Sequence, residues 1–179
     1  MRLTVDNVVN KPKKVAITID GYVPVDIKIH DPIGLPPLYW RVGNGDKSLL
    51  ELAILPENGF LSAITLVLIE PDSVHKSDSL SIRSPSESSG FPVVSLELWK
   101  GLNNDNFSQR FVDSFNINIQ ATISPSSILL VIGESNKNIK WIKCSDNLYI
   151  STDSQRNISG LFLDGLTKDE IEGFFEAIN

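Results

Sequence analysis

Three side chains could serve as imidazole or thiol ligands of a metal, or as parts of a nucleophile–base pair: His30, His75 and Cys144. A zinc site needs clustered ligands, and a Ser-His-Asp triad needs a histidine that an acid holds in place. His30 falls on the polar side of an alternating strand pattern and His75 in a serine-rich stretch, so we expect both to be exposed. Cys144 closes a predicted strand and should pack there. These residues therefore predict no catalytic site, no metal and no cofactor.

The stretch from Gly43 to Ser48, Gly-Asn-Gly-Asp-Lys-Ser, resembles a phosphate-binding loop. In such a loop Gly-Lys-Ser opens a helix whose N–H groups converge on the phosphates. Here Asp46 separates glycine from lysine and places a negative charge where the anion would lie. The residues that follow, 49–55, have a strand pattern, so we predict a tight turn. Carboxylate pairs could hydrolyse glycosides, but 22 acids offer no way to choose one, and we predict that the chain is not an enzyme.

The balance of charge limits the partners. The 179 residues carry a formal net charge of -6 and a pI of about 4.9. A general nucleic-acid binder is basic, because phosphate contacts supply most of its affinity. The acidity therefore predicts no nucleic-acid partner. It is compatible with simple solubility and, as a sharper interpretation, with a cationic partner.

The expected cellular location of the protein is inferred from the lengths of its apolar segments. The N-terminus lacks the apolar run of a signal peptide, and the longest apolar stretch, residues 63–69, is too short to cross a bilayer. We expect a cytoplasmic protein that does not contact a membrane.

Alternation of apolar and polar residues dominates the chain and predicts β-strands. Two hairpins stand out: residues 14–19 and 23–29 flank Asp20-Gly21, and residues 48–55 and 60–69 flank a Pro-Glu-Asn-Gly turn. The strand at 60–69 is apolar on both faces, so we expect it to be central and covered on both sides. Further strands are predicted at 91–98, 115–122, 128–132, 139–144, 148–151 and 158–163.

One helix is predicted, at the C-terminus. Thr167 and Glu170 have the spacing of a capping box. An apolar stripe at i, i+3, i+4 and i+7 should pack on a sheet, with Gly173 marking a close approach: Ile171, Phe174, Phe175 and Ile178. The fold class is therefore α+β, predominantly antiparallel β, with two packed sheets or a sandwich and a C-terminal α-helix.

The serine- and proline-rich segment 71–90 interrupts the strand pattern. It predicts a long loop or linker with at most a short strand at 80–82. We expect one domain, 1–179, or two β subdomains, 1–70 and 91–179, that this segment joins.

Acidic and aromatic residues in predicted turns could form a binding surface, with charges that steer a partner and rings that anchor it. The predicted partner-binding residues are Glu57, Asp72, Asp78, Glu87, Asp105 and Phe107.

The second hairpin resembles a stretch of small bacterial immunity proteins, which neutralise the toxin domains of contact-dependent growth inhibition and related polymorphic toxin systems. The resemblance rests on Ser48-Leu49-Leu50-Glu51-Leu52, then Asn58-Gly59, then Ile64-Thr65-Leu66-Val67-Leu68-Ile69. It implies a chain that binds one cognate toxin domain, a cationic nuclease in many such systems, and covers its active site. It supplies no binding residues.

A second interpretation remains open from the residues: a non-catalytic β-sandwich module that binds carbohydrate or peptide. Trp40, Trp99 and Trp141 would form its platform if they faced solvent. Two of them lie in predicted strands, so we expect core packing.

Overall fold

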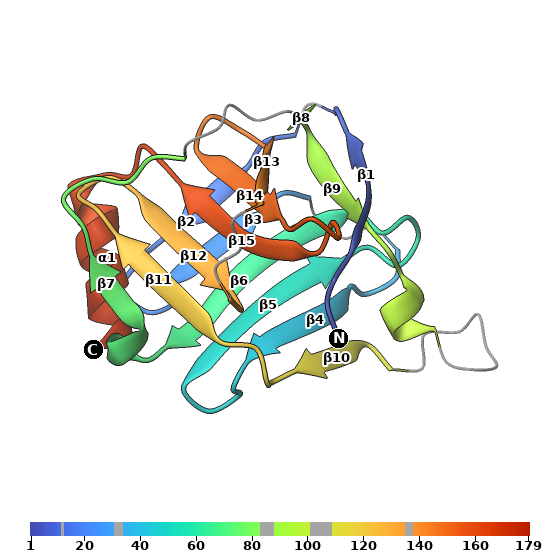
Figure 1. The fold of residues 1–179 in the computed structure, drawn as a ribbon, viewed down its shortest axis with the longest axis horizontal. Helices are drawn as coiled ribbons and strands as arrows, with labels where there is room; N and C mark the ends of the chain where they lie inside the picture. Colours follow the sequence, from blue (N-terminus) through green and yellow to red (C-terminus); the bar gives the residue numbers. More distant parts are fainter. Residues whose placement is uncertain (12, 31–33, 83–87, 101–108, 135–137) are drawn as a thin grey trace.

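Two β-sheets pack face to face in the computed structural model, which describes residues 1–11, 13–30, 34–82, 88–100, 109–134 and 138–179 (Figure 1). One sheet has six strands, in the spatial order β10 (Phe111–Ser114), β4 (Leu38–Gly43), β5 (Ser48–Ile54), β6 (Leu61–Ile69), β3 (Val25–Lys28) and β2 (Ala16–Thr18). The other has seven, in the order β7 (Val74–Lys76), β11 (Ile119–Ile123), β12 (Ile128–Ile132), β15 (Ile158–Leu163), β14 (Leu148–Thr152), β13 (Lys140–Lys143) and β8 (Ser88–Ser89).

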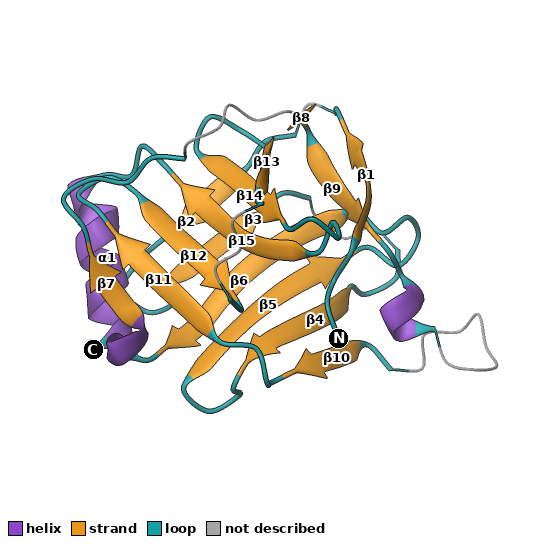
Figure 2. Cartoon of the chain, viewed as in Figure 1, coloured by secondary structure: helices purple, strands orange, loops and turns teal. Residues whose placement is uncertain are grey.

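Neighbouring strands within the two sheets are antiparallel except at three edges. There β10 pairs with β4, β7 with β11 and β8 with β13 in parallel. With the single C-terminal helix (Figure 2), this confirms the predicted α+β class with predominantly antiparallel sheets.

A two-stranded ribbon of β1 (Val5–Val9) and β9 (Phe91–Val94) lies at the side of the sandwich away from the helix (Figure 1). Isolated bridges join it to both sheets, because Thr4 pairs with Asn157 and Phe60 pairs with Val93. Two short 3-10 helices, η1 (Pro71–Ser73) and η2 (Glu97–Trp99), complete the described elements.

The inner faces of both sheets form one apolar core, which includes Trp40, Leu50, Leu66, Leu130 and Leu161. Both predicted hairpins are confirmed, as β2–β3 and β5–β6. Strand β6 lies between β5 and β3, as a central strand should. The expected covering of its second face is wrong. Its residues there, Ala63, Thr65 and Val67, are only half-buried.

Two strand predictions are corrected by non-local pairing. The alternating run 115–122 is not one strand: β10 ends at Ser114 and β11 begins at Ile119, with a turn between them. In the serine-rich segment, strands form at 74–76 and 88–89, whereas the described residues 80–82 have no strand. These short strands exist because the free edges of β11 and β13 offer hydrogen-bonding partners, which the local sequence does not reveal.

The C-terminal helix α1 (Lys168–Ile178) has the predicted capping box. Thr167 Oγ1 accepts a bond from the backbone N–H of Glu170, whose carboxylate accepts one from the N–H of Thr167. Phe174 is fully buried and the rest of the stripe packs against the core. A Cβ at Gly173 would lie 3.1 Å from the carbonyl oxygen of Ile19, so the predicted close approach is also confirmed. Among the described residues, no helix has the length and apolar character to cross a membrane.

Replacing Thr167 with alanine should lower the free energy of unfolding by about 1 kcal/mol, because the N–H of Glu170 loses its acceptor. Urea unfolding followed by circular dichroism measures this change. Thr167→Ser keeps the hydroxyl and should unfold close to the wild type. A loss below about 0.3 kcal/mol in the alanine variant would contradict a stabilising role for this cap.

Candidate functional site

The outer face of the six-stranded sheet carries a continuous row of polar side chains. The strand registers align one residue from each strand, in the order Asp113, Arg41, Glu51, Thr65, Asp26 and Thr18. All six are half-buried or exposed, whereas their neighbours along each strand are buried or point to the core. The row holds three carboxylates and one guanidinium, and the ammonium of Lys28 on the same face lies 3.8 Å from the carboxylate of Asp26, so the excess of negative charge here is small.

Arg41 forms a bidentate ion pair within the row. Its Nε and Nη2 donate to the two carboxylate oxygens of Asp113, at 2.7 and 2.9 Å. This hydrogen bonding raises the pKa of Arg41. A bidentate pair of this kind fixes the plane of the guanidinium and removes side-chain freedom before any partner binds.

Aromatic rings surround this arginine. The guanidinium carbon lies 4.6 Å from the ring centre of Phe111 and 5.7 Å from that of Phe115. Phe111 also stacks on Tyr39, with ring centres 5.1 Å apart. Phe111 and Phe115 are 42% and 39% exposed, which is unusual for phenylalanine. We call Tyr39, Arg41, Phe111, Asp113 and Phe115 the aromatic–arginine patch.

The patch has the composition of a protein-binding hot spot. Tyrosine, phenylalanine and arginine are enriched at the centres of protein interfaces, where they bury large areas at a small entropic cost. The stacking and the ion pair hold these rings in place in the unbound chain. The arrangement suits recognition of a protein surface and contains no acid–base pair for catalysis.

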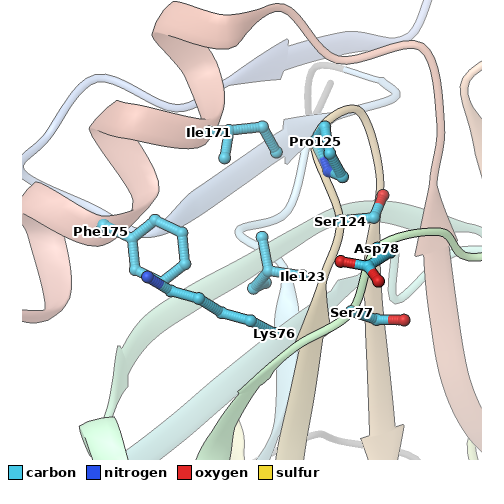
Figure 3. Close-up of a pocket in the computed structure, with 8 residues that line it drawn as sticks. All are labelled: Lys76, Ser77, Asp78, Ile123, Ser124, Pro125, Ile171 and Phe175. Carbon is cyan, nitrogen blue, oxygen red and sulfur yellow. The ribbon is translucent and has the colours of Figure 1, made fainter.

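A concave region lies between β7, the turn from β11 to β12, and α1 (Figure 3). It encloses about 580 Å³ and is lined by Lys76, Ser77, Asp78, Ile123, Ser124, Pro125, Ile171 and Phe175. The ammonium of Lys76 lies 4.7 Å from the ring centre of Phe175, and Figure 3 shows the two side chains alongside each other. The two serine hydroxyls that line this region donate to backbone carbonyl oxygens: Ser77 to that of Ser79, and Ser124 to that of Ser127. The groove therefore offers no activated nucleophile.

The structure does not gather the predicted partner-binding residues. Glu57 lies exposed in the turn between β5 and β6, where its Oε1 accepts a bond from the N–H of Leu35 at 3.2 Å. Asp72 in η1 and Asp78 after β7 are exposed beyond the other end of β6. The nine residues of β6 span about 30 Å. Glu87, Asp105 and Phe107 lie outside the described residues.

The two histidines and the cysteine that were considered as catalytic or metal-binding residues lie apart from the aromatic–arginine patch. Burial raises the pKa of Cys144 to about 12, so it is a neutral thiol at physiological pH. His75 is exposed on β7. His30 is half-buried rather than exposed, edge-on to the ring of Phe60, with its Nδ1 3.2 Å from Lys13 Nζ. Among the described residues, no group of three or more histidines, cysteines or acids could hold a metal ion.

The look-alike of a phosphate loop is the tight turn between β4 and β5, as predicted. Asn44 Oδ1 accepts bonds from the N–H groups of Asp46, Lys47 and Ser48, so these donors are not available to an anion. The tryptophans pack in the interior, as expected: Trp40, Trp99 and Trp141 are at most 9% exposed. They do not form a sugar platform.

The aromatic–arginine patch was not predicted. Tyr39 and Arg41 alternate with buried Leu38, Trp40 and Val42, so the period of two does mark them as outward-facing. Nothing local indicates that β10 pairs with β4 and brings Phe111 beside them, because about 70 residues separate the two strands.

Comparison with known proteins identifies a relative. No family model matches the chain. The chain is 49% identical over 85 residues to "Immunity protein CdiI-1" of Escherichia coli O157:H7 (strain EC869), a match that covers 48% of this chain and 99% of the relative. This confirms the resemblance drawn from the second hairpin. The chain belongs to the family of bacterial immunity proteins of contact-dependent growth inhibition.

Proposed function

We propose that this immunity protein binds one cognate toxin domain, a nuclease, and neutralises it by covering its active site. The observation that carries this proposal is the 49% identity to an immunity protein over 99% of that protein's length. Binding without catalysis is consistent with the two regions described above, where Arg41 pairs with Asp113 and the hydroxyls of Ser77 and Ser124 donate to backbone oxygens.

A nuclease toxin fits the charge of this chain. A nuclease must attract a polyanion, so its active site lies in a positive field. The chain carries a net charge of -6, and on the outer face of the six-stranded sheet three carboxylates lie beside two cations, Arg41 and Lys28. An acidic inhibitor is drawn to the surface that would otherwise hold RNA or DNA, and the association slows as salt rises.

We assign the contact to the outer face of the six-stranded sheet. Its patch supplies rigid anchors, Phe111 and Arg41, and its row supplies negative charge for a cationic partner. Acidic loop residues would form the rim that steers the toxin inward: Glu57, Asp72 and Asp78, together with Glu87 and Asp105. Phe107 would add an aromatic anchor there; Glu87, Asp105 and Phe107 lie outside the described residues.

The test is co-expression with the toxin domain encoded immediately upstream. Cells that produce both proteins should grow, the two should elute together from a sizing column, and the purified complex should not degrade nucleic acid that the free toxin degrades. Cell death without any complex would refute the immunity role. A protected toxin that acts on a substrate other than nucleic acid would refute only the nuclease assignment.

Neutralising the three described rim acids together, with Glu57→Gln, Asp72→Asn and Asp78→Asn, should slow association with the toxin about threefold to tenfold at low salt. The dissociation rate should hardly change, because exposed charges act mainly on the encounter. Glutamine at position 57 keeps an oxygen for the N–H of Leu35. Stopped-flow mixing at several salt concentrations measures both rates.

A matched control removes three exposed charges elsewhere, with Asp146→Asn, Asp169→Asn and Glu172→Gln in the β13–β14 turn and on α1. Its association rate should fall clearly less than that of the rim variant. Equal slowing by both sets would show that only the net charge of the chain matters and that the rim assignment is wrong.

A further inference from the structure

The two sheets repeat one strand arrangement. Strands β2 to β6 form the order β4-β5-β6-β3-β2, and strands β11 to β15 form the order β13-β14-β15-β12-β11. In both sets a hairpin is followed by a crossover and a three-stranded meander whose last strand pairs with the hairpin. Five strands with the same order and the same directions make up most of each sheet.

The registers agree residue by residue at the first turn of each meander. The N–H groups of Asn44 and Gly45 both donate to the oxygen of Ser48, and those of Cys144 and Ser145 both donate to Leu148, a shift of 100 residues at each position. The same shift relates the strand pairs beside these turns, Val42–Leu50 to Ile142–Ile150 and Arg41–Glu51 to Trp141–Ser151. The two pairs Val42–Leu50 and Ile142–Ile150 are both buried.

The two sets also bind each other reciprocally. Strand β1, which precedes the first set, pairs with β9, and β10, which directly precedes the second set, pairs with β4 of the first set. The segment that follows each set crosses to the opposite sheet: β7 pairs with β11, and α1 places Gly173 against the backbone of Ile19 and Gly21, just after β2. These two segments meet where Lys76 lies over the ring of Phe175, at the left of Figure 1.

We propose that this chain is two copies of one folding unit, residues 1–82 and 88–179, fused in a single polypeptide, and that the inner faces of the two sheets are the interface through which the units bind. The match to the immunity protein CdiI-1 spans 99% of that protein but only 48% of this chain. One unit therefore has roughly the length of a complete immunity protein.

The units have diverged on their outer faces. Arg41, Glu51 and Asp26 in the first unit correspond through the registers to Trp141, Ser151 and Val131 in the second. Three charged positions thus correspond to neutral ones, of which Trp141 and Ser151 are buried, so the two sheets present different surfaces to a partner. If the proposed function holds, the toxin docks where the two units meet, because the patch combines β4 of the first unit with β10 of the second. The fused-pair proposal itself does not depend on the toxin.

The proposal is tested by cutting the full chain between the units. A specific protease site in place of residues 83–87 allows the folded protein to be cleaved after purification. The two fragments should stay together as a 1:1 complex on a sizing column. The midpoint of thermal unfolding should now rise with protein concentration, because unfolding has become a dissociation, whereas that of the uncut chain should not.

A matched variant carries the same site in the turn between β5 and β6, in place of residues 56–58. Cutting there divides the first unit, so the midpoint should fall much further and the fragments should separate at micromolar concentration. The proposal is overturned if the fragments of the first variant separate under these conditions, or if both cuts leave equally stable complexes. Neither readout uses the toxin, so failure here leaves the immunity role standing.

Discussion

Replacing Trp40 with alanine should lower the free energy of unfolding by about 3–5 kcal/mol, the range for deleting a buried aromatic side chain. Trp40 is fully buried between the sheets. Its Nε1 donates to Ser114 Oγ at 3.0 Å, and that hydroxyl donates to the carbonyl oxygen of Met1 at 2.8 Å. The substitution opens a cavity and disrupts a link between β4, β10 and the N-terminus, which are distant in sequence.

Urea unfolding measures this effect as a lower midpoint with an unchanged slope. Trp40→Phe loses the hydrogen bond to Ser114 but keeps most of the volume, so its free energy of unfolding should fall clearly less. Tyr22→Ala removes a ring that is 88% exposed and should change stability very little. A loss of less than about 1 kcal/mol for Trp40→Ala would mean that the core relaxes around the deletion and that the two sheets do not depend on this contact.

Local signals in the sequence were enough for most of the sheet elements. The hairpin at Pro56-Glu57-Asn58-Gly59 is predictable because Asn58 Oδ1 accepts from the N–H of Phe60 and Gly59 takes a φ of +73°, both within the turn itself. The helix start at Thr167 is equally local. In each case the residues that select the structure are neighbours in the chain.

Pairings between distant segments were not predictable. Strands β7 and β8 are three and two residues long, with no pattern of their own, and they exist only because β11 and β13 present free edges. Strand β10 was likewise not predicted, and the strand predicted at 115–122 begins too early, because Phe115 continues an alternating run although it lies in a turn beside Gly45. A single sequence does not say which edges will meet.

The same limit applies to the candidate site. Acidity and turn composition point to single exposed residues such as Glu57 and Asp72, which the fold leaves at opposite ends of β6. The aromatic–arginine patch needs the register between β10 and β4, which places Phe111 beside Tyr39 and Asp113 beside Arg41. Its side chains look unremarkable in the sequence and become a surface only after folding.

Replacing Phe111 with alanine should weaken toxin binding about 30-fold or more, equivalent to about 2 kcal/mol. The ring is 42% exposed, stacks on Tyr39 and covers the guanidinium of Arg41, so it can enter a pocket on the partner without rearrangement. Because much of the ring is already in solvent, the folded chain should lose little stability. The affinity is measured by calorimetric titration of the toxin domain, and the dissociation rate should account for most of the change.

Tyr22 supplies the matched control for this surface. It is a more exposed aromatic residue, in the turn between β2 and β3, and the patch does not include it. Tyr22→Ala should therefore bind the toxin as the wild type does, although it removes a larger exposed ring. If Phe111→Ala binds within about twofold of the wild type, or if Tyr22→Ala weakens binding equally, the toxin does not dock on the patch. The immunity role would then have to lie on another face, since the family relationship does not depend on this surface.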